Sequence, residues 1–347
     1  MGLLLSYPLK SKALFRHGTE HLRVGGASMQ GYRTEMEDSH QLIVDYNGGY
    51  FFGVYDGHCG SKASKFCSER IHKYVEGEGN FEAKSIQKAV MQADKDFLTE
   101  SGGADDGTTA VFSIVQHREE TKDFFITIGN VGDSRAMLIT KSGEIFPLTD
   151  DHSPNVPEEA KRIKEAGGFV RNGRVNGNLA VSRAVGDRPY KTKDLAADKQ
   201  EVIPLPDVTF RTASEGDILL LACDGIYEQM DNTAVGKYVY EQVQKQPDLA
   251  IVAANLCEKS LQSGSQDNMT ALCVHFKDGT DVKPGNEFFW GPYYKDNSFA
   301  RAWRSFAADY GFSEEEIDSK ITEQLVERKE KRGAGSDNLV PISEAGN

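Results

Sequence analysis

The sequence predicts an α+β protein in which two β-sheets pack face to face and helices cover their outer faces. Short apolar runs of strand length occur in two blocks, and each block is accompanied by a pair of amphipathic helices. Hydrophobic residues make up 39% of the 347 positions, which is enough for a sizeable core. The longest apolar run, Ile218 to Cys223, suits a buried strand and is far shorter than the ~20 residues of a membrane span.

The N-terminal part of the chain changes character near residue 22. Residues 1–21 lack a clear periodicity, and we expect them to form a loose arm. The first clear strand pair is Gln41 to Tyr46 and Tyr50 to Tyr55. The intervening Asn47-Gly48-Gly49 is typical of a tight hairpin turn.

Apolar periodicity and turn residues predict the remaining elements of the sandwich. One short helix starts at Pro157 and stops at Gly167-Gly168. The polar stretch from Gly168 to Pro206 has little periodicity, and a segment of that length inside a domain is usually functional. In chain order we expect helices at 63–75 and 86–97, strands at 109–116, 124–131 and 135–140, the helix after Pro157, strands at 207–211 and 217–222, helices at 233–244 and 248–263, and a strand at 270–276.

A shift in composition after Pro284 divides the chain. We expect the main domain at 22–284, a C-terminal helical extension at 285–332 and a disordered tail at 333–347. The extension is marked by one apolar helical stripe and by one capping box: Phe299, Trp303, Phe306 and Tyr310, then Ser313 with Glu316.

Charge and cysteine content narrow the classes of function. The 40 basic and 53 acidic residues give a net charge of −13, which disfavours nucleic acid and anionic membranes as partners. The five cysteines are scattered without C-x-x-C spacing, as is typical of buried free thiols. Because the sequence opens without a signal peptide, we expect a cytoplasmic protein, and we expect it to be a monomer.

Carboxylates stand at the ends of several apolar strands. One Asp-Gly pair is ordinarily turn chemistry, but several carboxylates at one sheet edge would repel one another unless a cation neutralises them. Oxygen ligands without clustered Cys or His indicate Mg or Mn rather than Zn, and two such ions can hydrolyse phosphate esters. Arg33 is the candidate phosphate ligand, although a lone arginine more often forms a surface ion pair. The carboxylates are Glu37, Asp38, Asp56, Asp133, Asp224 and Asp267.

Seven short motifs follow one another along the chain. They are 28–38 (SMQGYRTEMED), 54–60 (VYDGHCG), 107–110 (GTTA), 132–135 (GDSR), 174–187 (RVNGNLAVSRAVGD), 222–226 (ACDGI) and 265–270 (SQDNMT). Each is weak alone, but together they are specific and span roughly residues 22 to 277. In this order they resemble the type 2C (PPM-type) metal-dependent serine/threonine protein phosphatases. The resemblance implies a four-layer α-β-β-α sandwich with two central antiparallel β-sheets.

The resemblance also implies a site for two metal ions. Asp56 would bridge both ions. Asp224 and Asp267 would complete one site, while Glu37 and the Gly57 carbonyl would complete the other.

Further roles follow from the same resemblance. Arg33 would bind substrate phosphate, Asp38 would order metal-bound water, and His58 would protonate the leaving seryl or threonyl oxygen. Without the resemblance, a lone histidine after a glycine is more often a turn residue. A third, weaker ion would use Asp133 and Asp224 with Glu228, which stands where the family usually has Asp.

The stretch from Gly168 to Pro206 matches the family's variable flap beside the catalytic cleft. Its segment Ser182 to Asp187 is strongly family-like, yet the residues alone give no chemical role for Arg183 or Asp187. An ion pair that anchors the flap and a contact to substrate both remain open for them.

The N-terminus fits the pattern for N-myristoylation, with Gly2 as acceptor and Ser6 downstream. A single acyl chain binds membranes weakly, and Lys10, Lys12 and Arg16 would add a modest second signal. The expectation is a cytoplasmic protein with weak membrane association.

The predicted function is hydrolysis of phosphoserine and phosphothreonine in phosphoproteins by a water molecule that the metal pair activates. The alternative is a catalytically weak or inactive regulatory protein on the same fold. Such members typically lose metal carboxylates, whereas Glu37, Asp56, Asp224 and Asp267 are all present. A two-metal nuclease is a third class, but the basic track that it needs is missing from so acidic a chain.

Overall fold

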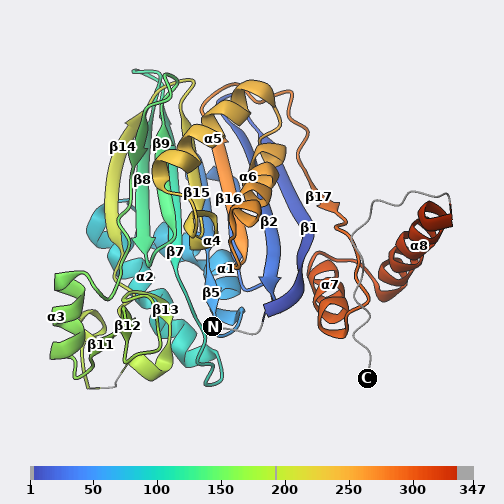
Figure 1. Cartoon of the computed structure of the whole chain (residues 1–347). Helices are drawn as coiled ribbons and strands as arrows, with labels where there is room; N and C mark the ends of the chain where they lie inside the picture. Colours follow the sequence, from blue (N-terminus) through green and yellow to red (C-terminus); the bar gives the residue numbers. More distant parts are fainter. Residues whose placement is uncertain (1–3, 192–193, 334–347) are drawn as a thin grey trace.

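Two antiparallel sheets face each other in the computed structural model, which describes residues 4–191 and 194–333 (Figure 1). The larger sheet has the order β10-β9-β15-β16-β2-β1-β17 and the smaller has the order β14-β8-β7-β4-β3. The larger contains β1 (Leu4–Gly18), β2 (Arg23–Arg33), β9 (Arg135–Ile139), β10 (Ile145–Pro147), β15 (Ile218–Ala222), β16 (Met269–His275) and β17 (Gly285–Phe289). The smaller contains β3 (Ser39–Tyr46), β4 (Gly49–Tyr55), β7 (Ala110–Arg118), β8 (Asp123–Val131) and β14 (Asp207–Ala213).

Helices cover the outer face of each sheet, so the predicted four-layer α-β-β-α sandwich is confirmed. On the five-stranded sheet lie α1 (Lys62–Gly77) and α2 (Ala83–Glu100), and on the seven-stranded sheet lie α5 (Asn232–Lys245) and α6 (Leu249–Ser263). The apolar stripes predicted for the first pair are their buried faces. None of the helices in the described part of the chain combines the length and apolarity needed to cross a membrane.

Strand β4 shows how one sheet serves two cores. Its side chains alternate: Phe52 and Val54 pack between the two sheets, while Phe51 and Tyr55 pack against the helices on the other face. Because successive side chains point to opposite faces of a strand, a strand covered on both sides is apolar throughout. The predicted hairpin turn before β4 is confirmed, since Asn47 and Gly48 have φ of 50° and 73°, the left-handed values that a tight two-residue turn requires.

The loose arm expected at residues 1–21 is wrong for most of its length. Leu4–Gly18 forms β1, which pairs with β2 on one side and β17 on the other. The register shifts between Leu4 and Leu9 and again between Leu9 and Lys12, and such bulges break the alternation of side chains that reveals a strand in sequence. The expected acceptor Gly2 lies outside the described residues.

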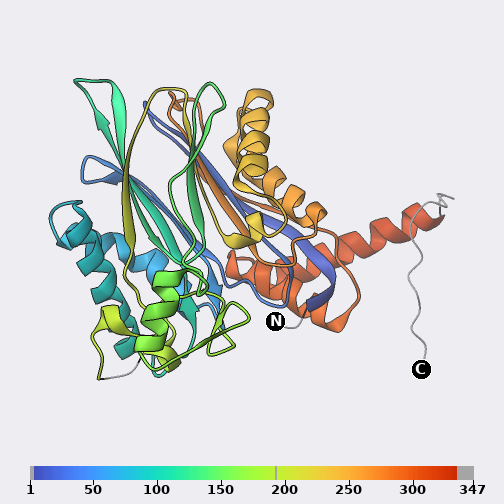
Figure 2. The ribbon, with the colours of Figure 1, turned by 60° about the vertical axis from the view of Figure 1, so that its left-hand side comes forward.

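The C-terminal extension begins as part of the sandwich, because β17 adds an edge strand to the larger sheet. It then forms α7 (Asn297–Asp309) and α8 (Glu314–Gly333). Trp303 and Phe306 of α7 share a buried cluster with Leu5 and Leu9 of β1. In Figure 2, α7 lies beside the sandwich and α8 runs away from it.

The helix boundary inside this extension follows the predicted capping box. The Ser313 N–H donates to Glu316 Oε2 at 2.8 Å, and the Glu316 N–H donates to Ser313 Oγ at 3.3 Å. The tail expected at 333–347 lies, after Gly333, outside the described residues.

The flap segment has a structure of its own. The helix predicted after Pro157 is α3 (Pro157–Glu165), and it packs on a small apolar cluster that includes Val175, Val181 and Val202. A three-stranded sheet in the order β13-β6-β5 joins the flap to the sandwich. The short elements are β5 (Gly57–His58), β6 (Gly107–Thr108), β11 (Val170–Arg171), β12 (Arg174–Val175), β13 (Val185–Gly186) and the 3-10 turns η1 (Arg188–Tyr190) and η2 (Ala197–Lys199).

Candidate metal centre

Strand ends deliver the predicted carboxylates to one edge of the sandwich. Asp56 follows β4, Asp133 follows β8 after one glycine, and Asp224 follows β15 as the first residue of α4 (Asp224–Tyr227). Asp267 precedes β16, which is antiparallel to β15, so the start of one strand lies beside the end of the other.

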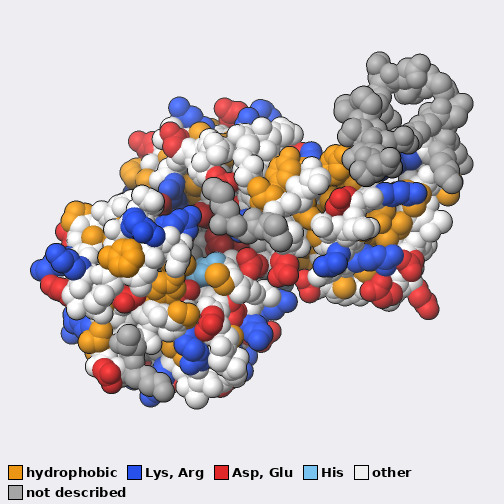
Figure 3. Space-filling model, turned by 60° about the horizontal axis from the view of Figure 1, so that its bottom comes forward, with side chains coloured by type: hydrophobic (Ala, Val, Ile, Leu, Met, Phe, Trp, Pro, Cys, Tyr) orange, Lys and Arg blue, Asp and Glu red, His pale blue; other side chains and the backbone are white. Residues whose placement is uncertain are grey.

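These side chains line a single pocket of about 520 Å³. Figure 3 shows acidic side chains in a hollow on this face of the molecule. Of the residues predicted for the site, only Asp38 is not in the pocket wall. The predicted residues that line the wall are Arg33, Glu37, Asp56, Gly57, His58, Asp133, Asp224, Glu228 and Asp267.

The pocket carboxylates repel one another. Burial raises the pKa of Asp56 well above its usual range, and the neighbouring carboxylates, Asp224 first among them, raise it further. Asp224 shows the same direction, with burial as the largest cause and Asp133 as the next. Burial followed by Asp151 raises the pKa of Asp133 to about 6. Bound cations would remove this repulsion, and an all-oxygen donor set suits hard divalent ions.

Close backbone packing positions Glu37 beside Gly57. Glu37 Oε1 accepts the Gly60 N–H at 2.5 Å, and the Glu37 N–H donates to Asn268 Oδ1 at 2.9 Å. A Cβ atom on Gly57 would lie 2.4 Å from the Glu37 carbonyl oxygen, which is closer than atoms can approach. Only glycine therefore permits this arrangement of the two predicted ligands.

Asp38 lies beneath the pocket and is 7% exposed. Its Oδ2 accepts the Thr270 hydroxyl at 2.7 Å, whereas its buried Oδ1 has no partner among the described residues. Burial raises the pKa of Asp38 to about 7, and Asp267 contributes in the same direction. A buried acceptor without a donor is rare in proteins, and a water molecule held by metal ions would supply that donor. The residues present therefore fit a metal centre.

Cys223 lies close to Asp38 and Asp56, with candidate ligand atoms of all three within 4.8 Å of one another. Its sulfur accepts the Thr270 N–H at 3.1 Å, and burial raises the pKa of its thiol well above the usual range. A protonated, hydrogen-bonded thiol is a poor metal ligand, so Cys223 belongs to the core rather than to the ligand set.

Arg33 provides positive charge at the pocket wall. Its Nη2 lies 2.5 Å from Asp267 Oδ2. Burial alone would lower the pKa of Arg33, but the attraction of Asp267 outweighs it and the pKa is raised. The guanidinium thus stays charged next to a predicted metal ligand.

Glu228 braces the loop before Asp267. Its Oε2 accepts the Ser265 hydroxyl at 2.9 Å and the Gln266 N–H at 2.9 Å. One carboxylate oxygen is therefore committed to the protein, a role that sequence reasoning did not foresee for this residue.

His58 has a partner that sequence reasoning missed. Its Nε2 lies 2.8 Å from Asp187 Oδ2, and Asp187 is 2% exposed. Burial alone would lower the pKa of His58, but Asp187 outweighs it and the pKa is raised. A Cβ atom on Gly107 would lie 2.2 Å from Asp187 Oδ2, so this glycine makes room for the pair. The only signal in the sequence was that Asp187 ends a family-like motif.

The role of Arg183, left open from sequence, is that of an anchor. Its Nη2 lies 2.7 Å from Glu159 Oε1 and its Nη1 lies 2.8 Å from Asp207 Oδ1. Glu159 belongs to α3 and Asp207 begins β14, so the ion pairs tie the flap to the five-stranded sheet.

Comparison with known proteins identifies the family. The family model described as "Protein phosphatase 2C" matches residues 22–269. "Protein phosphatase 1A" of Bos taurus is 32% identical over 364 residues, covering 99% of this chain and 87% of that protein. "Probable protein phosphatase 2C T23F11.1" of Caenorhabditis elegans is 37% identical over 292 residues, covering 79% of this chain and 80% of that protein. A solved phosphatase structure from Toxoplasma gondii superimposes with a TM-score of 0.74 at 29% identity, covering 80% of this chain and 99% of that one. The chain therefore belongs to the protein phosphatase 2C family of protein serine/threonine phosphatases.

Proposed function

We propose that this phosphatase hydrolyses phosphoserine and phosphothreonine in phosphoproteins with two Mg or Mn ions held at the carboxylate pocket. The observation that carries the proposal is the convergence of buried carboxylates with raised pKa values on one pocket that also holds Arg33 and His58. Perturbed carboxylates of this kind cluster at functional sites.

Five groups would hold the metal pair. They are Glu37, Asp56, the Gly57 carbonyl, Asp224 and Asp267, which all line the pocket. When bound, such a pair supplies an activated water for direct attack on phosphorus and positive charge for the phosphoryl oxygens.

The side chains around the pair would handle the substrate and the protons. Arg33 would bind and orient the phosphate through its guanidinium. Asp38 would orient the attacking water through its unpartnered Oδ1. In a doubly protonated His58, Nε2–H donates to Asp187, which leaves Nδ1–H to protonate the departing seryl or threonyl oxygen.

A third, weaker ion would use Asp133, Asp224 and Glu228. Because Glu228 Oε2 already accepts two hydrogen bonds, only its other oxygen would contribute to the ion. Crystals soaked at high Mn concentration should show three ions, and two ions only would contradict this part of the proposal.

Membrane association is a separate proposal that depends on acylation at Gly2. The expected second signal is weaker than the sequence indicates, because Lys10 and Lys12 pair with Glu258 and Arg16 pairs with Asp248. We therefore propose a mainly cytoplasmic protein that an acyl chain tethers weakly. Intact-mass measurement on protein from its native cell tests it, and an unmodified terminus would contradict it.

Phosphate release from a phosphothreonine peptide tests the central proposal. Release should require Mn or Mg, stop with EDTA and be lost in Asp56→Asn, which should also bind metal more weakly. Asp45→Asn changes an exposed carboxylate on β3 and should behave as the parent. Absence of metal-dependent release would favour the inactive regulatory alternative, and cleavage of nucleic acid instead would favour a nuclease.

A further inference from the structure

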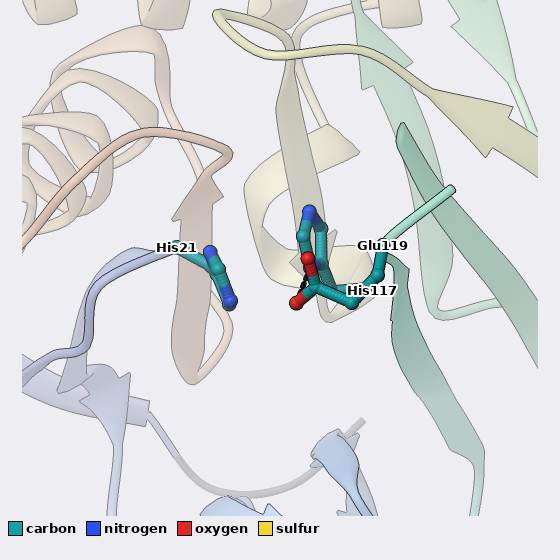
Figure 4. A group of neighbouring side chains, drawn as sticks. All are labelled: His21, His117 and Glu119. Carbon is teal, nitrogen blue, oxygen red and sulfur yellow. Dashed lines mark hydrogen bonds and ion pairs between the residues drawn. The ribbon is translucent and has the colours of Figure 1, made fainter. Parts of the chain in front are cut away.

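A second group of side chains of types that can bind a metal ion lies at the opposite end of the sandwich. His21 sits in the turn between β1 and β2, while His117 and Glu119 sit where β7 turns into β8 (Figure 4). Two imidazole nitrogens and one carboxylate oxygen from these residues all lie within 4.8 Å of one another. Strand β7 has 9 residues and runs from the carboxylate edge to this group, a separation of roughly 25–30 Å.

An apolar floor holds the two imidazole rings in place. The rings of His21 and His117 stack with centroids 3.9 Å apart. Phe124 lies against both, at 6.4 Å from His21 and 5.0 Å from His117. Phe124 itself is buried and packs on Phe276 at 4.6 Å. The core thus restricts both rings. Because an imidazole nitrogen binds a metal ion in the plane of its own ring, stacked rings do not aim at one point, and a shared ion requires the half-buried His21 ring to turn out of the stack.

Carboxylates already approach the imidazole nitrogens. Glu119 Oε1 lies 3.1 Å from His117 Nδ1, and Glu20 Oε1 lies 3.4 Å from His21 Nε2. Glu119 also pairs with Lys122 at 2.8 Å, but the two side chains are 70% and 72% exposed. Exposed pairs of this kind are weak, so a metal ion can displace Lys122.

We propose that His21, His117 and Glu119 bind a transition-metal ion such as Zn²⁺, with Glu20 within reach as a fourth ligand. Imidazole with carboxylate suits Zn, Ni or Cu, whereas the oxygen-only pocket suits Mg or Mn. Ligand atoms around tetrahedral Zn lie about 3.4 Å apart. Glu119 Oε1 already lies 3.1 Å from His117 Nδ1, so rotation of the His21 ring would bring the third ligand atom to this spacing.

The site would join the two sheets. His21 belongs to the seven-stranded sheet through β1 and β2, and His117 belongs to the five-stranded sheet through β7. An ion that binds the folded chain and not the unfolded one raises stability. The bound ion would therefore act as a clip at the end of the sandwich remote from the carboxylate pocket.

Calorimetric titration of the metal-free full-length protein with Zn²⁺ tests the proposal. His21→Gln, His117→Gln and Glu119→Gln should each lose one equivalent of Zn²⁺ or bind it about tenfold or more weakly, since even outer-shell changes at metal-bound histidine cost roughly 10–100-fold. The neighbouring His17→Gln is the matched control and should retain the parental stoichiometry. Parental stoichiometry and affinity in all three ligand variants would overturn the proposal.

Cu²⁺ electron paramagnetic resonance separates this site from the carboxylate pocket. Nitrogen splitting from two imidazoles should be present in the parent and in His58→Ala, and absent in His117→Gln. Splitting that His58→Ala removes and His117→Gln preserves would place the nitrogen ligand in the pocket and refute the site.

Discussion

The carboxylates of the metal centre lie near Glu159 and Asp207, which anchor the flap through Arg183 and are called the anchor below. The pKa values of the two sets are shifted in opposite directions. Asp207 of the anchor pairs in register with Asn130, three residues before Asp133 of the centre. Burial alone would raise the pKa of Glu159, but Arg183, Ser182 and Arg162 lower it to about 2. His152 and Arg183 lower the pKa of Asp207 to about 2. In the centre, burial raises the pKa of Asp133 to about 6.

The opposite pKa shifts distinguish carboxylates that stabilise the fold from carboxylates that are positioned to bind a ligand. The buried carboxylate of the anchor faces two arginines that lie inside the protein, so its charge stabilises the folded chain. The carboxylates of the centre face mainly one another, so their charge destabilises the metal-free fold until cations bind. Stability lost at a functional site in this way is a common cost of activity.

The largest expected effect is that of removing one carboxylate from the metal centre. Asp224→Asn should lower metal-dependent turnover by at least about 10³-fold, because metal charge at the phosphoryl group is worth several kcal/mol. The same change should raise the unfolding free energy in EDTA by about 1 kcal/mol, since one of several repelling charges is removed. Phosphate release and urea unfolding measure the two effects. The exposed Glu215→Gln should change neither, and a less stable Asp224→Asn in EDTA would contradict the comparison.

At the anchor, removal of a carboxylate charge should lower the unfolding free energy instead of raising it. Glu159→Gln leaves Arg162 and Arg183 without their shared carboxylate, and it should lower the unfolding free energy by about 2–3 kcal/mol. The adjacent Glu158→Gln is exposed and should leave stability unchanged. Equal stability of the two variants in urea would show that the anchor does not hold the flap.

The pH dependence of stability should also differ in sign between the two regions. Glu159 has its pKa lowered from 4.5 to about 2, so its stabilisation is complete above 4.5 and fades as the pH falls towards 2. Asp38 has its pKa raised from 3.8 to about 7, so its penalty is absent below 3.8 and complete above 7. In EDTA, the unfolding free energy of Asp38→Asn should therefore rise relative to that of the parent as the pH increases from 3.8 to about 7.

Urea unfolding of the three proteins at several pH values checks this prediction. The unfolding free energy of Glu159→Gln should lie below that of the parent by a constant amount down to about pH 4.5, and this difference should shrink at lower pH. A constant difference between Asp38→Asn and the parent across the same range would show that Asp38 keeps its charge in the metal-free fold.

The sequence was most informative where the physical signal is local. The stripes of α1 and α2, the Asn47-Gly48 turn and the capping box of α8 were all predicted from spacings of a few residues, and the structure confirms them. Strand-end carboxylates also needed only the positions of apolar runs and their neighbours. The motif resemblance then supplied the roles that spacing alone could not.

What the sequence missed depends on distant partners. Strand β1 is held by β2 and β17, and its bulges near Leu9 hide the alternation. Asp187 meets His58 across 129 residues of chain, and Arg183 meets Asp207 across 24. No local pattern encodes such contacts, because topology creates them only when the flap folds onto the sandwich.

The smallest expected effect concerns His58 of the metal centre, which is paired with Asp187 of the flap. Asp187 has a left-handed φ of 54°, which asparagine also tolerates, so Asp187→Asn should fold normally while it removes the charge beside the imidazole. Without that charge the pKa of His58 falls, the alkaline limb of kcat shifts to lower pH, and kcat at alkaline pH drops roughly tenfold. The loss should vanish in a His58→Ala background and shrink on aryl phosphates, whose leaving groups need no proton. An unshifted pH profile would leave Asp187 with a structural role alone.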